Sequence, residues 1–236
     1  MTALDTLPKI LIWDLETTHL KGNMGWILCL SYKWAESDDV FYWRIDKEPG
    51  FGTSPKSFKN DKAGVEIMCD MLAEADAQCT HYGTRFDLRF LKTRCLAHGI
   101  PVPPPVRMID TWRYSRDNLA LTSNRLETLS NFLKTDQVKY KLPLELWAEA
   151  QFGDKKILDA MTKYCINDVE TLEKVYLKMR PLINDHPHCG LGAGKCPACG
   201  SFKIHRKGHR RTKLFFIERL HCQNCGTWSD GAKKKM

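Results

Sequence analysis

Long apolar runs are missing from this sequence. No stretch approaches the roughly 20 consecutive apolar residues that cross a bilayer, and Met1–Lys9 lacks the basic region followed by an apolar region that marks a signal peptide. Internal repeats are also missing, and the one low-complexity segment is Lys233–Lys235. We therefore expect an intracellular protein, cytoplasmic or nucleoid-associated, that does not associate with membranes.

Acidic residues are scarce in the last fifth of the chain. The 236 residues include 36 Lys or Arg and 28 Asp or Glu, for a net charge of +8. Residues 189–236 hold 11 of the basic residues and two of the acidic ones, so the rest of the chain is nearly neutral. A compact basic segment is typical of proteins that bind a polyanion, most often nucleic acid. A solvated tail that only adds solubility is the alternative.

The ten cysteines fall into two groups. Four form two C-x-x-C pairs, Cys196 with Cys199 and Cys222 with Cys225, each followed by glycine. In an intracellular protein this spacing favours a metal over disulfides. Four thiolates make a closed tetrahedral site, so we predict one structural Zn²⁺ and a zinc ribbon whose folding depends on the metal. The other six are expected to be buried thiols: Cys29, Cys69, Cys79, Cys95, Cys165 and Cys189.

Residues 201–205 and 212–221 are predicted to be the two strands of this ribbon, joined by the basic segment 206–211. Its basic side chains are candidates for contacts with phosphate, and neighbouring aromatic rings can stack on bases. These candidates are Arg206, Lys207, Arg210, Arg211 and Lys213. Docking of the ribbon on a protein, or on the rest of the chain, is the alternative.

The first 183 residues mix β and helical patterns. Strands are predicted at 9–14, 25–34, 40–45, 77–82 and 106–109. Helices are predicted at 62–75, 86–98, 124–134, 144–151 and 155–179. Three strands followed by helices that alternate with two more strands is the order of a ribonuclease H-like fold. We therefore predict an α/β domain over 1–183 with a mixed sheet flanked by helices, a linker over 184–194, and the zinc ribbon with a basic tail over 195–236.

Four carboxylates lie in three separated clusters. Asp14 and Glu16 are two residues apart on a strand, so their side chains point to the same side. Asp87 begins a helix, and Asp168 lies one helical turn after Tyr164, on the same helix face. Together they could hold two Mg²⁺ or Mn²⁺ ions about 4 Å apart, which activate a water and stabilise a leaving oxygen.

Taken singly, each cluster has a simpler explanation. The first could be a polar strand end, and the third an exposed Asp beside a core Tyr. Thr84 and Asp87 fit a capping box at the start of a helix. Asp110 is more consistent with a helix cap than with a metal ligand. Surface positions or local hydrogen bonds are expected for the histidines His19, His81 and His98.

The order and spacing of these motifs closely resemble the DEDD exonuclease superfamily, in its DEDDy branch. The D-x-E motif corresponds to Asp14-Leu15-Glu16, the helix-starting aspartate to Asp87, and the Y-x-x-x-D motif to Tyr164 through Asp168. The resemblance covers about residues 9–180 and includes the segments 109–112 and 126–132. One position departs from the family, whose second motif often has Asn before the glycine, because here that residue is Tyr82.

The resemblance implies a metal-dependent 3′–5′ exonuclease, and we favour DNA over RNA as its substrate. Its catalytic residues would be Asp14, Glu16, Asp87, Tyr164 and Asp168, with the four carboxylates as ligands of two Mg²⁺ or Mn²⁺ ions. Thr17 would lie near the 3′-terminal nucleotide. Because an unperturbed Tyr has a pKa near 10, Tyr164 is assigned to orient the attacking water. An exoribonuclease, and a nucleic-acid-binding adaptor with a vestigial nuclease site, are the alternatives; protein partners are not predicted.

Overall fold

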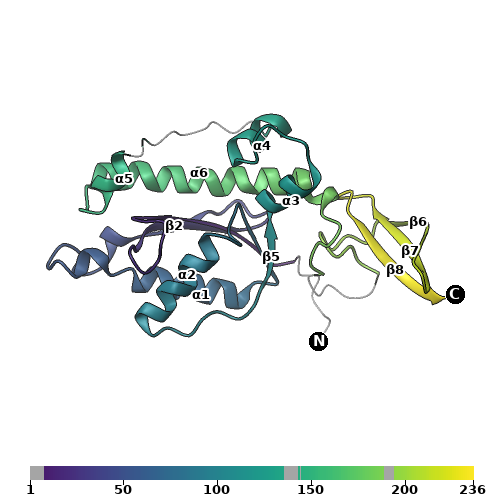
Figure 1. Cartoon of the computed structure of the whole chain (residues 1–236), viewed down its shortest axis with the longest axis horizontal. Coiled ribbons are helices and arrows are strands. Elements are labelled where there is room, and N and C mark those ends of the chain that lie inside the picture. The colour runs from purple at the N-terminus through teal and green to yellow at the C-terminus, as the bar shows by residue number, and fades with distance from the viewer. Residues whose placement is uncertain (1–7, 136–142, 144, 189–193) are drawn as a thin grey trace.

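A mixed sheet of five strands forms the centre of the larger part of the molecule (Figure 1). The computed structural model describes residues 8–135, 143, 145–188 and 194–236. The strands lie in the order β3-β2-β1-β4-β5. Pairing is antiparallel between β1, β2 and β3 and parallel between β1, β4 and β5. The bounds are β1 Ile10–Thr17, β2 Ile27–Trp34, β3 Phe41–Arg44, β4 Ala77–Thr80 and β5 Arg107–Asp110. The predicted ribonuclease H-like arrangement is confirmed.

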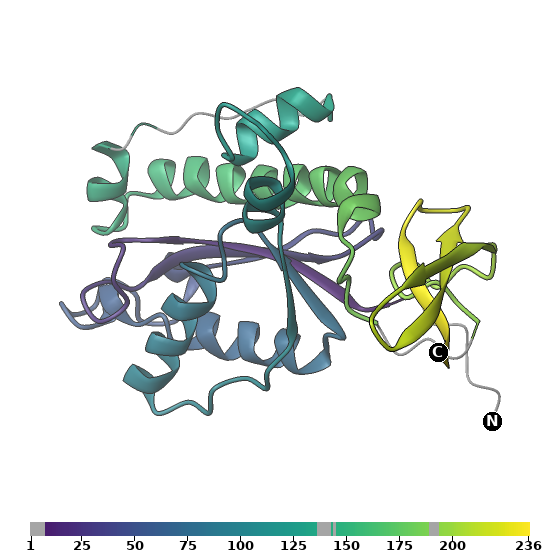
Figure 2. The same cartoon turned by 45° about the vertical axis from the view of Figure 1, so that its right-hand side comes forward.

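Helices cover both faces of this sheet (Figure 2). Helices α1 and α2 lie on one face, and the long helix α6 lies across the other, with α3, α4 and α5 beside it. Their bounds are α1 Lys62–Glu74, α2 Asp87–His98, α3 Thr111–Asn118, α4 Leu126–Leu133, α5 Glu145–Ala150 and α6 Lys155–Met179. Three 3-10 helices are η1 Ile45–Lys47, η2 Ser57–Lys59 and η3 Arg180–Leu182. None of the helices in the described ranges combines the length and apolar character that crossing a membrane requires.

Strand β1 has two different faces. Leu11, Trp13 and Leu15 pack in the core that also contains residues of α1 and α2. Ile10 and Ile12 pack in a second core with residues of α6. Because side chains alternate along a strand, Asp14 and Glu16 lie on the face that α6 covers.

β1 ends three residues later than predicted, at Thr17 instead of Asp14. Its parallel pairing with β4 ends at Ile12 and Cys79, but its antiparallel pairing with β2 continues to Thr17 and Ile27. The first carboxylates therefore lie inside β1, beyond the point where β4 turns away. This leaves room for side chains from other segments next to Asp14.

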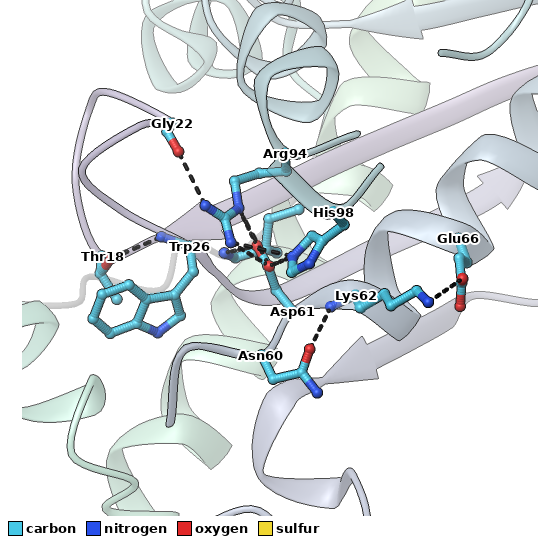
Figure 3. A network of polar contacts seen from close by, with 10 residues as sticks. Thr18, Gly22, Trp26, Asn60, Asp61, Lys62, Glu66, Arg94 and His98 are labelled. Carbon is cyan, nitrogen blue, oxygen red and sulfur yellow. Dashed lines mark hydrogen bonds and ion pairs between the residues drawn. The ribbon is translucent and has the colours of Figure 1, made fainter. Parts of the chain in front are cut away.

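A buried ionic network surrounds Asp61, the residue that precedes α1 (Figure 3). Asp61 is fully buried and accepts hydrogen bonds from Arg94 Nε and Nη2 at 2.8–3.2 Å and from the Ile27 amide at 2.8 Å. His98 Nε2 lies 2.6 Å from the same carboxylate. Arg94 also donates to the carbonyl of Gly22 at 3.2 Å. The network ties α2 to β2 and to the loop that follows β1.

The C-terminal part of the chain is a separate three-stranded antiparallel sheet, with β6 Ile204–Arg211, β7 Phe215–Cys222 and β8 Trp228–Lys235. The predicted turn over 206–211 is wrong, because these residues belong to β6. The turn follows Arg211 instead, where the Thr212 hydroxyl accepts from the amides of Leu214 and Phe215. Lys233–Lys235 likewise lies in β8, paired with β7. The predicted strand 201–205 overlaps only the start of β6, and β8 was not predicted, because the exposed basic side chains of these segments do not alternate with apolar ones.

Candidate active site and zinc centre

Asp14 and Glu16 point from β1 toward α6. Asp14 is partly buried, and Glu16 is 9% exposed. Trp147 of α5 donates from its Nε1 to Glu16 Oε2 at 3.2 Å, which fixes the orientation of that carboxylate. Sequence patterns gave no sign of this contact, because Trp147 lies 131 residues away in the chain.

Asp87 is the first residue of α2, where a negative charge interacts favourably with the helix N-terminus. Its carboxylate accepts hydrogen bonds from the backbone amides of Leu15 and of Asp87 itself. The N-cap residue is Phe86, which makes no side-chain cap, so the capping box expected from Thr84 does not form. Asp87 is instead buried against the backbone of β1, beside the first pair of carboxylates.

Tyr164 and Asp168 lie one turn apart on α6, hydrogen-bonded to each other. The Tyr164 ring makes an edge contact with Trp147, with ring centroids 6.0 Å apart. Burial, followed by the charges of Asp168, Glu16 and Asp14, raises the pKa of Tyr164 well above its ordinary value. The phenol therefore keeps its proton at neutral pH and donates it in the hydrogen bond to Asp168, which leaves its oxygen as an acceptor.

The four carboxylates repel one another in a partly dry environment. Burial raises the pKa of Asp14 well above its usual range, and the charges of Asp87 and Asp168 raise it further. The pKa of Glu16 is raised by burial and by Asp14 and Asp168. Burial raises the pKa of Asp87 to about 7. Such a cluster of acids is stable in its ionised form only when cations balance the charge.

The donor set fits hard divalent ions. Carboxylate oxygens are the ligands that Mg²⁺ and Mn²⁺ prefer, and all four belong to segments that converge beside β1. Cys165 lies next to Asp14, with Sγ 3.7 Å from its Oδ2, and ligand atoms of Asp14, Glu16 and Cys165 are within 4.8 Å of one another. Burial raises the pKa of the Cys165 thiol, so it remains protonated and is a poor ligand for a hard ion.

A cleft of about 560 Å³ opens beside these residues. Asp14, Tyr164 and Asp168 line it, whereas Glu16 and Asp87 are buried next to it. Other lining residues come from the segment after β4, from α3 and from α4 with its N-cap: His81, Tyr82, Trp112, Arg125, Leu126, Glu127, Ser130 and Asn131. Thr17 is not among the lining residues. It is buried, and its hydroxyl donates to the carbonyl of His19 at 2.9 Å.

Asp110 caps a helix and does not join the four carboxylates. It is the N-cap of α3 and accepts from the Arg113 amide at 3.2 Å. Its two oxygens also accept from the amides of Tyr82 and Thr84, at 3.0 and 3.1 Å. The cap interpretation agrees with this geometry. The histidines have local partners as well: His81 contacts Thr111, His98 contacts Asp61, and His19 accepts from the Lys21 amide.

Comparison with known proteins gives the family. The model of the RNase H superfamily matches residues 11–180, which include all four carboxylates. The chain belongs to the RNase H superfamily. Among curated proteins, no sequence matches this chain.

Solved structures share the RNase H fold of this chain. One is the family B DNA polymerase from the hyperthermophilic archaeon Pyrobaculum calidifontis, with a TM-score of 0.60 and 14% sequence identity. The match covers 74% of this chain and 25% of the polymerase chain. This chain thus resembles about a quarter of that polymerase in fold.

Outside the RNase H domain, four cysteines form a cluster that suggests a zinc site. The sulfur atoms of Cys196, Cys199, Cys222 and Cys225 lie within 4.8 Å of one another. Cys196 and Cys225 are 3.6 Å apart, and Cys199 and Cys222 are 3.7 Å apart. Tetrahedral Zn²⁺ with Zn–S bonds of about 2.3 Å requires S···S distances of roughly 3.8 Å. The cysteines thus match the metal in number, chemistry and spacing.

The three-stranded sheet and its four-cysteine cluster contact the end of the RNase H domain. The Thr227 hydroxyl donates to the carbonyl of Arg180 at 3.5 Å, and a side chain at Gly226 would come within 3.1 Å of Pro181. The basic candidates of the ribbon are all exposed. Arg206 pairs with Glu218 and Arg210 with Asp230. Across the described ranges, no carboxylate pairs with Lys207, Arg211 or Lys213.

Proposed function

We propose that this chain is a metal-dependent 3′–5′ exonuclease of the DEDDy type that acts on nucleic acid, with DNA as the favoured substrate. The observation that carries the proposal is the convergence of Asp14, Glu16, Asp87 and Asp168 beside a cleft, with Tyr164 hydrogen-bonded to Asp168. Membership of the RNase H superfamily, most of whose members are nucleases, supports it. The 3′–5′ direction comes from the DEDDy resemblance.

The four carboxylates would hold two Mg²⁺ or Mn²⁺ ions, which supply an activated water and charge stabilisation when bound. Trp147 holds the Glu16 carboxylate, and the Leu15 amide holds that of Asp87. Tyr164 retains its proton because its pKa is raised, and this O–H donates to Asp168, so the phenol oxygen would orient the attacking water by accepting a hydrogen bond from it. An adaptor with a vestigial site has no need of this complete set of charges, whose repulsion costs stability.

The ribbon would hold the nucleic acid outside the cleft. Its exposed basic side chains supply contacts to phosphate, and its Zn²⁺ would fix the sheet that carries them. The net charge of the segment makes a polyanion the natural ligand. Docking on a protein is the competing role, and the salt dependence of nucleic-acid binding separates the two.

The direct test uses one oligonucleotide sequence as single-stranded DNA, duplex DNA and RNA, labelled at either the 3′ or the 5′ end. With Mg²⁺, the 3′ label should appear at once as a mononucleotide, while the 5′ label passes through a ladder of shortening products. Faster cleavage of the RNA would identify an exoribonuclease instead. Internal cleavage, or no cleavage of any substrate, would contradict the proposal.

A further inference from the structure

Tyr82 has an unusual backbone conformation at the edge of the cleft. Its φ angle is +73°, in the left-handed region that bulky side chains rarely adopt. It follows β4 directly and occupies the position where the DEDDy motif often has Asn, a residue that tolerates this conformation better. Strain of this kind persists where the surrounding structure enforces it, and it concentrates at functional sites.

Asp110 and Gly83 enforce the conformation. The buried Asp110 carboxylate accepts from the amides of Tyr82 and Thr84, on either side of Gly83, at 3.0 and 3.1 Å. A side chain on Gly83 would lie 2.1 Å from Thr80 Oγ1, so the chain must pass close to β4 here. Asp110 also caps α3 through the Arg113 amide. One carboxylate therefore positions both Tyr82 and the helix that carries Trp112.

The two aromatic rings form one wall of the cleft. Tyr82 and Trp112 are in edge-to-face contact, with centroids 4.7 Å apart and planes at 78°. Arg116 lies over the Trp112 ring at 4.9 Å, and Arg85 at 6.0 Å. Tyr82 remains 39% exposed, and a single edge-to-face contact covers at most one face of its ring. An aromatic surface is therefore accessible in the cleft that Asp14, Tyr164 and Asp168 line.

We infer that Tyr82 and Trp112 form a stacking surface for a nucleobase, and that this surface binds the base of the terminal nucleotide whose phosphodiester faces the carboxylates. The inference rests on the proposed exonuclease function. Stacking on an aromatic ring needs an unpaired base but no particular sequence, since every base has a π face. The cleft volume of about 560 Å³ lies within the range of pockets that hold one small ligand. The surface favours single-stranded or frayed ends.

The test compares an oligonucleotide that has a normal 3′-terminal nucleotide with one whose 3′-terminal nucleotide is abasic; a third oligonucleotide is abasic at the 5′ end instead. KM and kcat are measured with Mg²⁺, and Kd with Ca²⁺ in place of Mg²⁺. For the wild type, the 3′-abasic change should raise KM and Kd roughly 5- to 150-fold, the range that base–aromatic stacking contributes elsewhere. The 5′-abasic change should have little effect.

Tyr82→Asn removes the ring but suits the left-handed backbone, so it should fold normally. It should raise KM for the normal substrate about as much as the abasic change does, with kcat within a few-fold, and it should no longer distinguish the two 3′ ends. Tyr82→Phe keeps the ring and should still distinguish the two 3′ ends. Tyr42→Ala on β3, which removes an exposed tyrosine that does not line the cleft, is the matched control.

Equal KM and Kd for normal and 3′-abasic substrates in the wild type would overturn the inference, as would undiminished discrimination in Tyr82→Asn. If the wild type binds without cleaving, the proposed function fails but the Kd comparison still decides the stacking surface. If it neither binds nor cleaves, both fail.

Discussion

At the scale of single residues, the cleft is built from acids that need a cation and from groups that hold those acids in place. Trp147, the Leu15 amide and Cys165 each contact a carboxylate; Trp147 lies outside the motifs, and the other two occupy positions that the motifs leave unspecified. The motif residues themselves could be predicted from the sequence, because their chemistry and spacing are local. Their partners could not, since contacts such as Trp147 to Glu16 depend on tertiary packing.

Tyr164→Phe tests the role of the phenol. The change removes one hydroxyl but keeps the ring that packs against Trp147 and every carboxylate. Positioning and proton-transfer groups typically contribute about 10²–10⁴-fold, and we expect a loss of kcat at or below the low end of that range. The measurement is the single-turnover rate of nucleotide release. A loss as complete as that of Asp14→Ala would show that the hydroxyl does more than orient water.

Asp87 should make the metal-free protein less stable as pH rises. Burial raises its pKa from 3.8 to about 7, so in this window the folded protein binds a proton that the unfolded chain has released. The contribution of this carboxyl to the free energy of unfolding is complete below about pH 4 and is lost as pH rises through about 7. Added Mg²⁺ should therefore raise Tm more at pH 8 than at pH 5.

Asp87→Asn supplies the control for this pH dependence, because an amide has no charge to lose. Its Tm without Mg²⁺ should fall less than that of the wild type between pH 5 and pH 8. Identical dependence of Tm on pH in the two proteins would show that burial does not raise the pKa of Asp87.

At the scale of helices and strands, elements with a regular apolar pattern could be predicted from the sequence, whereas elements with mostly exposed polar side chains could not. Helix α6 has the predicted bounds, because its apolar positions recur with helical spacing against a buried sheet. Helix α3 was not predicted as a separate element, since most of its side chains are polar. In the ribbon, most of β6 carries exposed basic side chains and β8 carries mostly exposed or half-exposed polar and basic ones, so neither showed the alternation that marks a strand.

The network of Asp61 gives a prediction at this scale (Figure 3). Asp61→Ala would leave Arg94, whose side chain is 12% exposed, without its buried partner. We expect a loss of about 3–5 kcal/mol in the free energy of unfolding, which is typical when one member of a buried ion pair is removed. Urea denaturation measures it.

Glu66→Ala is the matched control for Asp61→Ala. Glu66 pairs with Lys62 at 3.6 Å on the surface of α1, where both side chains are about half exposed. Its loss should cost no more than about 1 kcal/mol. Comparable losses for the two variants would mean that the buried network does not hold α2 to β2.

At the scale of the whole molecule, the ribbon should contribute to substrate binding and the RNase H domain to hydrolysis. Removing residues 189–236 leaves every proposed Mg²⁺ ligand but deletes the basic segment. The truncated protein should bind less tightly and still hydrolyse at saturating substrate. Its plot of log K against log salt should be shallower, by about 0.9 per lost phosphate contact on duplex DNA and about 0.7 on single strands.

Cys196→Ser should reproduce the truncation within the full chain, because the loss of one thiolate opens the Zn²⁺ site and unfolds the ribbon. Zinc content and the salt dependence of binding are the two measurements. Unchanged affinity and salt slope in both proteins would indicate that the ribbon docks on a protein instead.

Four carboxylates from three distant segments of the chain should together form one ion-dependent hydrolytic site. The most direct test is Mg²⁺-dependent mononucleotide release from a 3′-labelled strand by the wild type and by Asp14→Ala, Glu16→Ala, Asp87→Ala and Asp168→Ala, each checked for folding by its Tm. Each variant should remain folded and lose nearly all activity, because each lacks a ligand of the shared site. Near-normal rates in any two folded variants, or release by the wild type without divalent ions, would contradict the account.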